Sequence, residues 1–187
     1  MCTYARIRNG FEQNIDTVVT ANCSVDLLTY SAGVLCSQLK QPRVAYVKLN
    51  GDTIWQGSFC GNGSNPRGVN TLLVDPFACS VLQSRRFDTH SSSTDAAHLR
   101  DYIRRLNRGS VIIGVTADEP RSSLGFALSA LREIGVDVDD VRYRGSFAFI
   151  AQKGYRAKTV LSKVVGETES NKAPASVSAV ITGAVYK

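Results

Sequence analysis

The chain has 187 residues, enough for one domain with a buried core, and its 43% hydrophobic and 20% charged residues are an ordinary globular composition. No apolar run approaches the roughly 20 residues of a membrane span, so we expect no membrane insertion. The net charge of +6 allows weak attraction to acidic polymers, but the cations are scattered and no nucleic-acid motif is present, so we expect no nucleic-acid partner.

Strand signals dominate the first half of the chain after a weakly patterned start of 35 residues. "RVAYVKL" (43–49) and "DTIWQG" (52–57) flank Asn50-Gly51, which predicts a hairpin because both turn positions need positive φ. "GNGSNPRG" (61–68) follows as a loop. "VNTLLVD" (69–75) and "SVLQSRRFD" (80–88) are typical of two further strands.

Two helices and more strands are predicted in the second half. The stretch 90–109 predicts a helix with a cap near Ser93 and an end at Gly109, and its buried stripe consists of Leu99, Tyr102, Ile103 and Leu106. "LGFALSALREI" (124–134) is the second helix, and strands are expected at 110–116, 141–154, 158–165 and 175–186. This order predicts a mixed α/β fold in which helices cover sheet.

Cysteine usage favours an exported protein. The sequence predicts two disulfides and one spare thiol, with 15 possible arrangements, among Cys2, Cys23, Cys36, Cys60 and Cys79. There is no CxxC pair, and His90 and His98 are distant, so we expect no metal and no cofactor. The sequons at Asn22 and Asn62 also suit a secreted glycoprotein. The N-terminal residues lack the apolar stretch of a signal peptide, so either the protein is cytosolic or a leader was removed.

Catalytic motifs are missing from the sequence. It contains no GxSxG, P-loop, GxGxxG or HExxH pattern, and we therefore expect a protein that is not an enzyme. A Ser/His/Asp triad, whose members are dispersed along a chain, is not excluded by this pattern search.

Six stretches carry a family resemblance. "GDTIWQGS", "PRGVNTLLVD", "RRFDTH", "VIIGVTADEP", "ALREIG" and "YRGSFAFIAQKG" stand in the order and spacing of one domain family. The chain resembles the domain shared by the interleukin-like inducer of epithelial–mesenchymal transition and pancreatic-derived factor. The same domain occurs in the stem of protein O-mannose N-acetylglucosaminyltransferase and in cell-surface hyaluronan-binding proteins.

The resemblance implies an exported, disulfide-linked and non-catalytic domain. The expected class is mixed α/β (α+β), with compact β-sandwich-like sheets flanked by two to three short helices. We predict a single domain over 1–187, with N-terminal strands in 1–42, the family core in 43–154 and C-terminal strands in 155–187. The cysteines depart from the pattern of the cytokine-like members, so their pairing stays open.

The resemblance also implies a sugar site. In the transferase stem two arginines and an aspartate hold the sugar, and the matching residues here are Arg67, Asp118 and Arg144. Guanidinium donors and carboxylate acceptors together suit neighbouring sugar hydroxyls or an N-acetyl carbonyl. Tyr143 and Trp55 could offer ring faces to the sugar.

Two interpretations of these residues stay open, as do the functions that follow. Asp118 and Arg144 either contact a sugar or form a salt bridge that only fixes a loop. The leading hypothesis is a secreted, lectin-like protein that binds a glycan or glycoprotein, aided by a homodimer or higher oligomer. The alternatives are a secreted cytokine-like ligand of a protein receptor and a structural extracellular domain.

Overall fold

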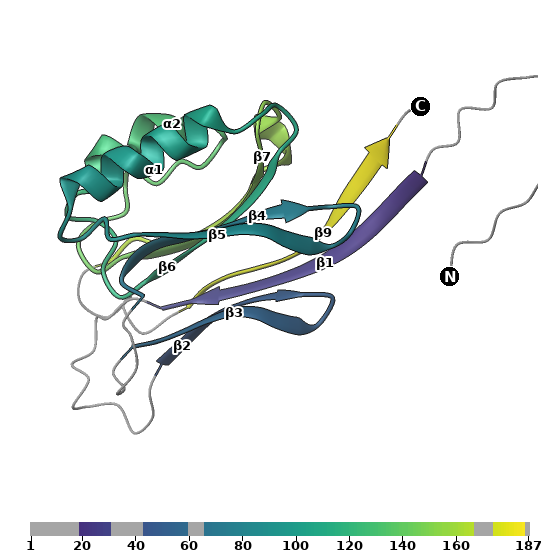
Figure 1. Cartoon of the computed structure of the whole chain (residues 1–187). Coiled ribbons are helices and arrows are strands. Elements are labelled where there is room, and N and C mark those ends of the chain that lie inside the picture. The colour runs from purple at the N-terminus through teal and green to yellow at the C-terminus, as the bar shows by residue number, and fades with distance from the viewer. Residues whose placement is uncertain (1–18, 31–42, 60–65, 167–173, 186–187) are drawn as a thin grey trace, which may run out of the picture.

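The structure is a computed structural model that describes residues 19–30, 43–59, 66–166 and 174–185. Two antiparallel sheets stack face to face, and both helices lie on one outer face of the larger sheet (Figure 1). The smaller sheet has the order β3-β2-β1-β9 and the larger has the order β5-β4-β6-β7-β8. The described part of the chain is therefore a sandwich with a helical layer on one side.

The elements have the following bounds. The smaller sheet contains β1 (Val19–Thr29), β2 (Arg43–Leu49), β3 (Asp52–Phe59) and β9 (Ala175–Val185). The larger contains β4 (Gly68–Asp75), β5 (Ser80–Phe87), β6 (Val111–Ala117), β7 (Ser146–Gln152) and β8 (Val160–Val164). The helices are α1 (Ser93–Arg105) and α2 (Leu128–Glu133), with single 3₁₀ turns at η2 (Leu124–Phe126) and η3 (Arg156–Lys158). Neither helix is long and apolar enough to cross a membrane.

Several local predictions are confirmed. β2 and β3 form the predicted hairpin, with φ of 49° at Asn50 and 89° at Gly51. α1 begins where expected, because Ser92 Oγ accepts a hydrogen bond from the Asp95 N–H. Every residue of β6 is buried, as its continuous apolar run predicts for a strand covered on both faces.

The core has two layers on either side of the larger sheet. One lies between that sheet and the helices, and its fully buried side chains include Leu99, Ile103, Leu131, Phe147 and Phe149. The other lies between the sheets and includes Val25, Val47, Leu72, Ile113 and Ala148. Apolar side chains of β6 and β7 therefore alternate between the two layers, which explains why the central positions of both strands are apolar.

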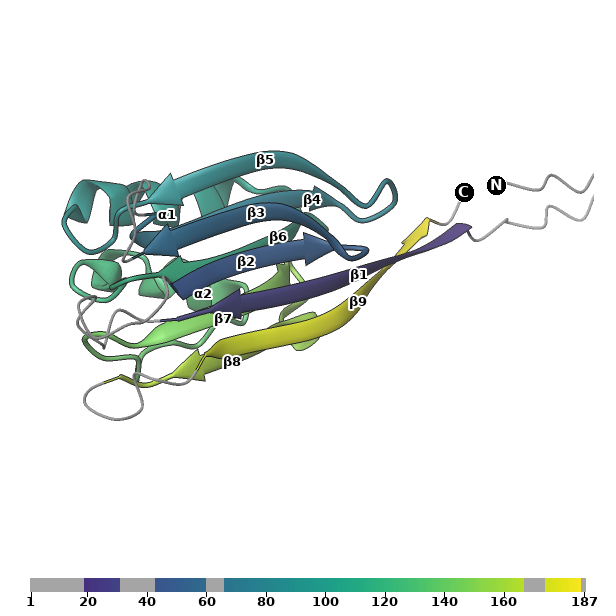
Figure 2. The same ribbon diagram turned by 90° about the horizontal axis from the view of Figure 1, so that it is seen from below.

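The predicted mixed α/β (α+β) class is wrong. Each strand pair in the described residues is antiparallel, and the structure is mostly sandwich, with just two α-helices there. The error has a physical cause: the helices carry strong 3.6-residue periodicity, whereas β1 lies in weakly patterned sequence. β1 and β9 are the longest strands, and they pair over 11 positions from Val19↔Val185 to Thr29↔Ala175. Figure 2 shows their ends running beyond the other strands.

One disulfide joins the two sheets. Cys23 on β1 bonds to Cys79, which lies in the turn between β4 and β5. This finding resolves one pair among the arrangements left open by the sequence. The predicted second disulfide and spare thiol involve Cys2, Cys36 and Cys60, which lie outside the described residues. The sequon at Asn62 and most of the predicted N-terminal segment 1–42 also lie outside them.

Gly114 of β6 offers a test of the helix-side core. A Cβ at this position would lie 2.1 Å from the Phe149 ring, whereas one at exposed Gly125 would meet nothing within 4 Å. We expect Gly114→Ala to lower the free energy of unfolding by about 1–3 kcal/mol through overpacking. Gly125→Ala should change it by less than about 0.5 kcal/mol. Urea unfolding measures both, and equal effects would contradict this description of the core.

Removing the disulfide should loosen the sandwich. Cys23 and Cys79 are 56 residues apart, so their bond closes a long loop in the unfolded chain. We expect Cys23→Ala/Cys79→Ala to lose about 2–4 kcal/mol of unfolding free energy relative to wild type. Urea unfolding without reductant measures this loss. Unchanged stability would show that the bond does not constrain the unfolded chain.

Candidate functional site

Three segments meet at one end of the larger sheet. Gly68 of β4 pairs with Ala117 of β6, so Arg67 and Asp118 are the next residues beyond this pair. The Arg144 N–H, two residues before β7, donates to Glu119 Oε1 at 3.3 Å. We call this end of the sheet the rim; it comprises residues 66–67, 88–91, 118–122 and 143–144. The structure therefore brings the backbones of all three predicted sugar-contacting residues to one rim.

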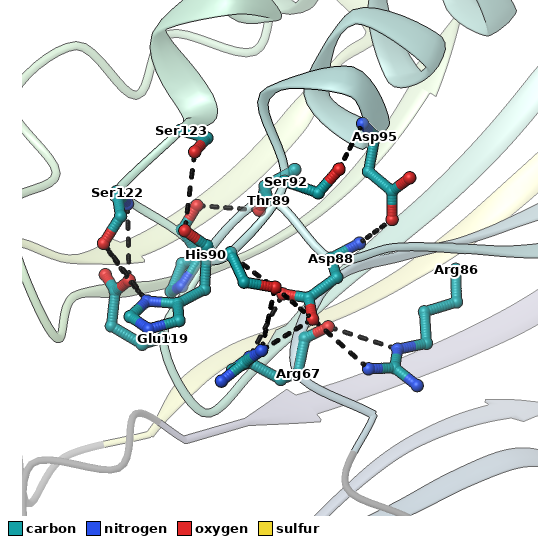
Figure 3. Close-up of polar contacts among 12 residues, drawn as sticks. Arg67, Arg86, Asp88, Thr89, His90, Ser92, Asp95, Glu119, Ser122 and Ser123 are labelled. Atoms are coloured by element: carbon teal, nitrogen blue, oxygen red, sulfur yellow. Dashed lines mark hydrogen bonds and ion pairs between the residues drawn. The ribbon is translucent and has the colours of Figure 1, made fainter.

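Arg67 is fixed by an aspartate that was not predicted as a site residue. Its Nε and Nη2 donate to the two carboxylate oxygens of Asp88 at 3.1 and 2.7 Å, and Nη2 also donates to Ser91 Oγ at 2.9 Å (Figure 3). These bonds use three of the five guanidinium N–H groups, and the side chain stays 32% exposed. Arg67 is thus oriented by the protein and still accessible.

Despite partial burial, the contacts with Arg67 and Ser91 lower the pKa of Asp88. Burial acts to raise it, but the hydrogen bonds from Arg67 and Ser91 outweigh burial and hold the Asp88 pKa well below its usual range. The same bond to Asp88 raises the pKa of Arg67, and the charges of Asp118 and Glu119 raise it further. Both acidic residues of the loop after β6 therefore act electrostatically on the Arg67 guanidinium.

Glu119 holds the rim together, although sequence reasoning singled out only its neighbour Asp118. Its side chain is buried and accepts from His90 Nδ1 at 2.5 Å, the Arg121 N–H at 2.8 Å and Ser122 Oγ at 2.9 Å. Burial acts to raise the pKa of Glu119, but these bonds lower it overall, so the group is a carboxylate at neutral pH. With its contact to Arg144, Glu119 connects three of the rim segments.

Ser122, His90 and Glu119 lie together but do not have the geometry of a catalytic triad (Figure 3). Ser122 Oγ lies 3.1 Å from His90 Nδ1, and Glu119 Oε2 contacts the same nitrogen. A triad places the acid at one imidazole nitrogen and the hydroxyl at the other, so that a proton can pass through the ring. The cluster instead fixes the loop after β6.

Asp118 and Arg144 adopt unusual backbone conformations. Their φ angles are 58° and 60°, in the left-handed region that non-glycine residues seldom occupy. Both side chains are half-buried. The Arg144 guanidinium carbon lies 5.3 Å from the centre of the Tyr143 ring, within the range of a cation–π contact. Such strained conformations are concentrated at binding sites and turns.

The two predicted aromatic residues have different surroundings. Tyr143 is 49% exposed and belongs to the rim. Trp55 lies on β3 in the other sheet, where its half-buried ring packs against Ala45 and Ala117 and lies beside Gly57. The structure therefore brings Tyr143 to the predicted site and places Trp55 in the packing between the sheets.

Comparison with known proteins gives a family match that contains most of the rim. Residues 67–155 match the family model described as interleukin-like EMT inducer. The predicted resemblance is confirmed. The matched segment contains Arg67, Asp118, Tyr143 and Arg144 but not Trp55.

Two curated relatives are similar to the chain at low identity. A cell surface hyaluronidase of Danio rerio is 29% identical over 107 residues, which is 56% of this chain and 7% of the relative. Cell surface hyaluronidase CEMIP2 of Homo sapiens is 28% identical over 76 residues, 41% of this chain and 6% of the relative. The chain thus spans less than a tenth of the length of either relative.

The ion pair of Arg67 and Asp88 predicts a pH effect. Because the folded-state pKa of Asp88 is depressed, its contribution to stability is present above the usual aspartate pKa of about 4 and is lost as the pH falls toward the folded-state value. We expect Asp88→Asn to cost on the order of 1 kcal/mol of unfolding free energy at pH 7, since the pair is partly exposed. The difference from wild type should shrink at pH 3.

Urea unfolding at several pH values measures this difference. Arg67→Gln and the double variant complete a thermodynamic cycle that isolates the pair. A difference between Asp88→Asn and wild type that stays constant from pH 7 to pH 3 would refute the assignment.

Proposed function

We propose that the rim is a glycan-binding site and that the protein is an exported, lectin-like protein without enzymatic activity. The observation that carries this proposal is the meeting of Arg67, Asp118 and Arg144 at one end of the larger sheet, with Arg67 already oriented by Asp88. A binding site that is ordered before the ligand arrives loses less entropy on binding.

The chemistry of the rim suits an N-acetylated sugar. The Nη1 group of Arg67 makes no hydrogen bond within the described residues, so its donors can reach a carbonyl or hydroxyl oxygen. Asp118 supplies acceptors for sugar hydroxyls. Tyr143 carries an exposed ring beside the Arg144 guanidinium, which suits the apolar face of a sugar. Both curated relatives are named cell surface hyaluronidase, and that name also points to a glycan.

Export and assembly belong to the same proposal. The Cys23–Cys79 disulfide favours an oxidising compartment, and Asn22 of the first sequon is exposed on β1. A shallow site of this kind would bind one sugar near millimolar, on the order of −4 kcal/mol. Oligomers would then raise the affinity for a glycan that presents several sugars. The loop-fixing role of Ser122, His90 and Glu119 supports a non-enzymatic domain.

Two neighbouring arginines allow a matched test. Arg142 and Arg144 carry the same charge, but the Arg144 guanidinium lies over the Tyr143 ring. The exposed Arg142 makes its described hydrogen bonds through its backbone, from its N–H to Val165 O and from the Gly145 N–H to its carbonyl oxygen. We expect Arg144→Ala to weaken binding of N-acetylglucosamine at least about tenfold, because charge-assisted hydrogen bonds are lost. Arg142→Ala should weaken it less than about twofold.

NMR titration of wild type and both variants measures these affinities. No binding by wild type, or equal losses in the two variants, would refute the proposal. A folded-state check by circular dichroism separates lost binding from lost structure.

A second candidate function is a cytokine-like ligand for a protein receptor. Two exposed aromatic residues favour it: Phe126 is 58% exposed and Tyr143 is 49% exposed, and each lines a shallow hollow that includes Arg121 and Ser122. This function predicts nanomolar binding to a protein that survives competition by free sugar. Loss of partner binding on addition of N-acetylglucosamine would favour the glycan site instead.

A further inference from the structure

A second concave surface lies away from the predicted sugar-contacting residues, between α1 and the edge strand β5. It is a groove of about 870 Å³ whose lining includes Leu73 and Phe87 from the sheet and Tyr102 and Arg105 from the helix. We call it the α1–β5 groove. None of Arg67, Asp118 and Arg144 lines it.

The groove follows from the way α1 packs. The helix buries Leu99 and Ile103 in the core layer that also holds Phe87. β5 is the edge strand of the larger sheet, and its side chains become exposed away from that contact, as at Arg85. Gln83, Arg85 and Phe87 occupy every second position of the strand, so their side chains point to the same face, and all three line the groove. The α1–β5 groove is therefore lined by polar side chains around the apolar residues at its base.

The acidic side chains of the groove are already engaged. Asp101 accepts from Arg100 Nε at 2.8 Å, and Asp95 accepts from the Asp88 N–H at 2.9 Å. Arg86 lies 3.8 Å from the Asp88 carboxylate. Within the described residues these interactions leave two lining arginines, Arg85 and Arg105, without a carboxylate at salt-bridge distance.

The two arginines approach the groove from different elements. Arg85 comes from β5 and lies over the Tyr102 ring, with 5.2 Å from its guanidinium carbon to the ring centre. Arg105 comes from the last turn of α1. The amides of Gln83 and Asn107 line the same surface and can both donate and accept hydrogen bonds. Guanidinium groups pair well with carboxylate and sulfate oxygens, and amides pair with hydroxyls.

We propose that the α1–β5 groove binds an acidic polysaccharide, with Arg85 and Arg105 contacting its carboxylate or sulfate groups and Gln83 and Asn107 contacting its hydroxyls. This site shares no lining residue with the rim, although Arg86 and Asp95 of its lining contact Asp88, and it does not depend on glycan binding at the rim.

The lining favours a polysaccharide over a nucleic acid. Its aromatic residues are Phe87, which is 4% exposed, and Tyr102, whose ring lies against both Arg85 and Phe87. Neither offers an open face for a base, whereas proteins that bind single strands use such faces for stacking. The disulfide also favours an exported protein, and acidic polysaccharides are abundant outside cells.

Adjacent arginines on α1 give a matched test. Arg104 faces away from the groove, because it donates to Glu133 at 3.0 Å and Ser129 at 3.2 Å on α2. We expect Arg105→Gln and Arg85→Gln each to weaken binding of a heparin octasaccharide about tenfold, since charge-assisted hydrogen bonds are lost. Arg104→Gln, which removes the same charge, should weaken it less than about twofold.

Isothermal titration calorimetry at constant ionic strength measures these affinities, with circular dichroism to verify folding. A hyaluronan octasaccharide in a second series identifies the anionic group. Binding of heparin alone supports a sulfate contact, and binding of both supports a carboxylate contact. Arg144→Ala should leave heparin affinity unchanged even if it abolishes binding of N-acetylglucosamine.

Several results would overturn the proposal. Equal losses for Arg104→Gln and Arg105→Gln would mean that only net charge matters. Single-stranded DNA of matched charge that binds as tightly, with the same dependence on Arg105, would identify a general polyanion site. Binding of neither polysaccharide by wild type, or an equal loss for Arg144→Ala, would exclude a separate acidic-glycan groove.

Discussion

The buried carboxylate of Glu119 is the interaction on which the rim depends. A charged group with 4% exposure is costly unless hydrogen bonds replace its water, and here His90, Ser122 and two backbone N–H groups of the following residues do so. Because the Arg144 N–H also donates to it, this carboxylate holds the loop after β6 against the segment before β7. Glu119 thus keeps Asp118 and Arg144 close together without itself having to contact a ligand.

Local features of the fold could be predicted from the sequence, because the signals that specify them are local. Asn50-Gly51 determines a tight turn by its own backbone preferences, and the cap of α1 requires only Ser92 and Asp95. The long pairing of β1 with β9 could not be predicted in this way. It joins Val19 to Val185, and no short-range pattern records which distant strand completes a sheet edge. The class assignment failed for this reason: strong helical periodicity outweighed two long strands with weak local signals.

The candidate site shows the same contrast between features that local sequence specifies and contacts that join distant segments. The start of β4 and the end of β6 could be placed near one another once the strands were identified. Arg67 precedes Gly68 and Asp118 follows Ala117, and these two strand residues are paired. The residue that orients Arg67 could not be predicted in this way, because Asp88 is 21 residues away and follows a different strand. Trp55 illustrates a residue whose location the sequence did not specify. Its ring is large enough to bind a sugar, but burial of that same surface against Ala45 and Ala117 stabilises the sandwich.

The position of the disulfide constrains the order of events during biogenesis. Cys23 is the middle residue of the sequon that starts at Asn22, and in the folded protein Asn22 is paired with Thr182 on a long strand ribbon. An oligosaccharyltransferase acts on accessible chain that is not yet paired in a sheet. Any carbohydrate on Asn22 is therefore expected to be attached before β9 docks on β1, in competition with oxidation of the adjacent thiol.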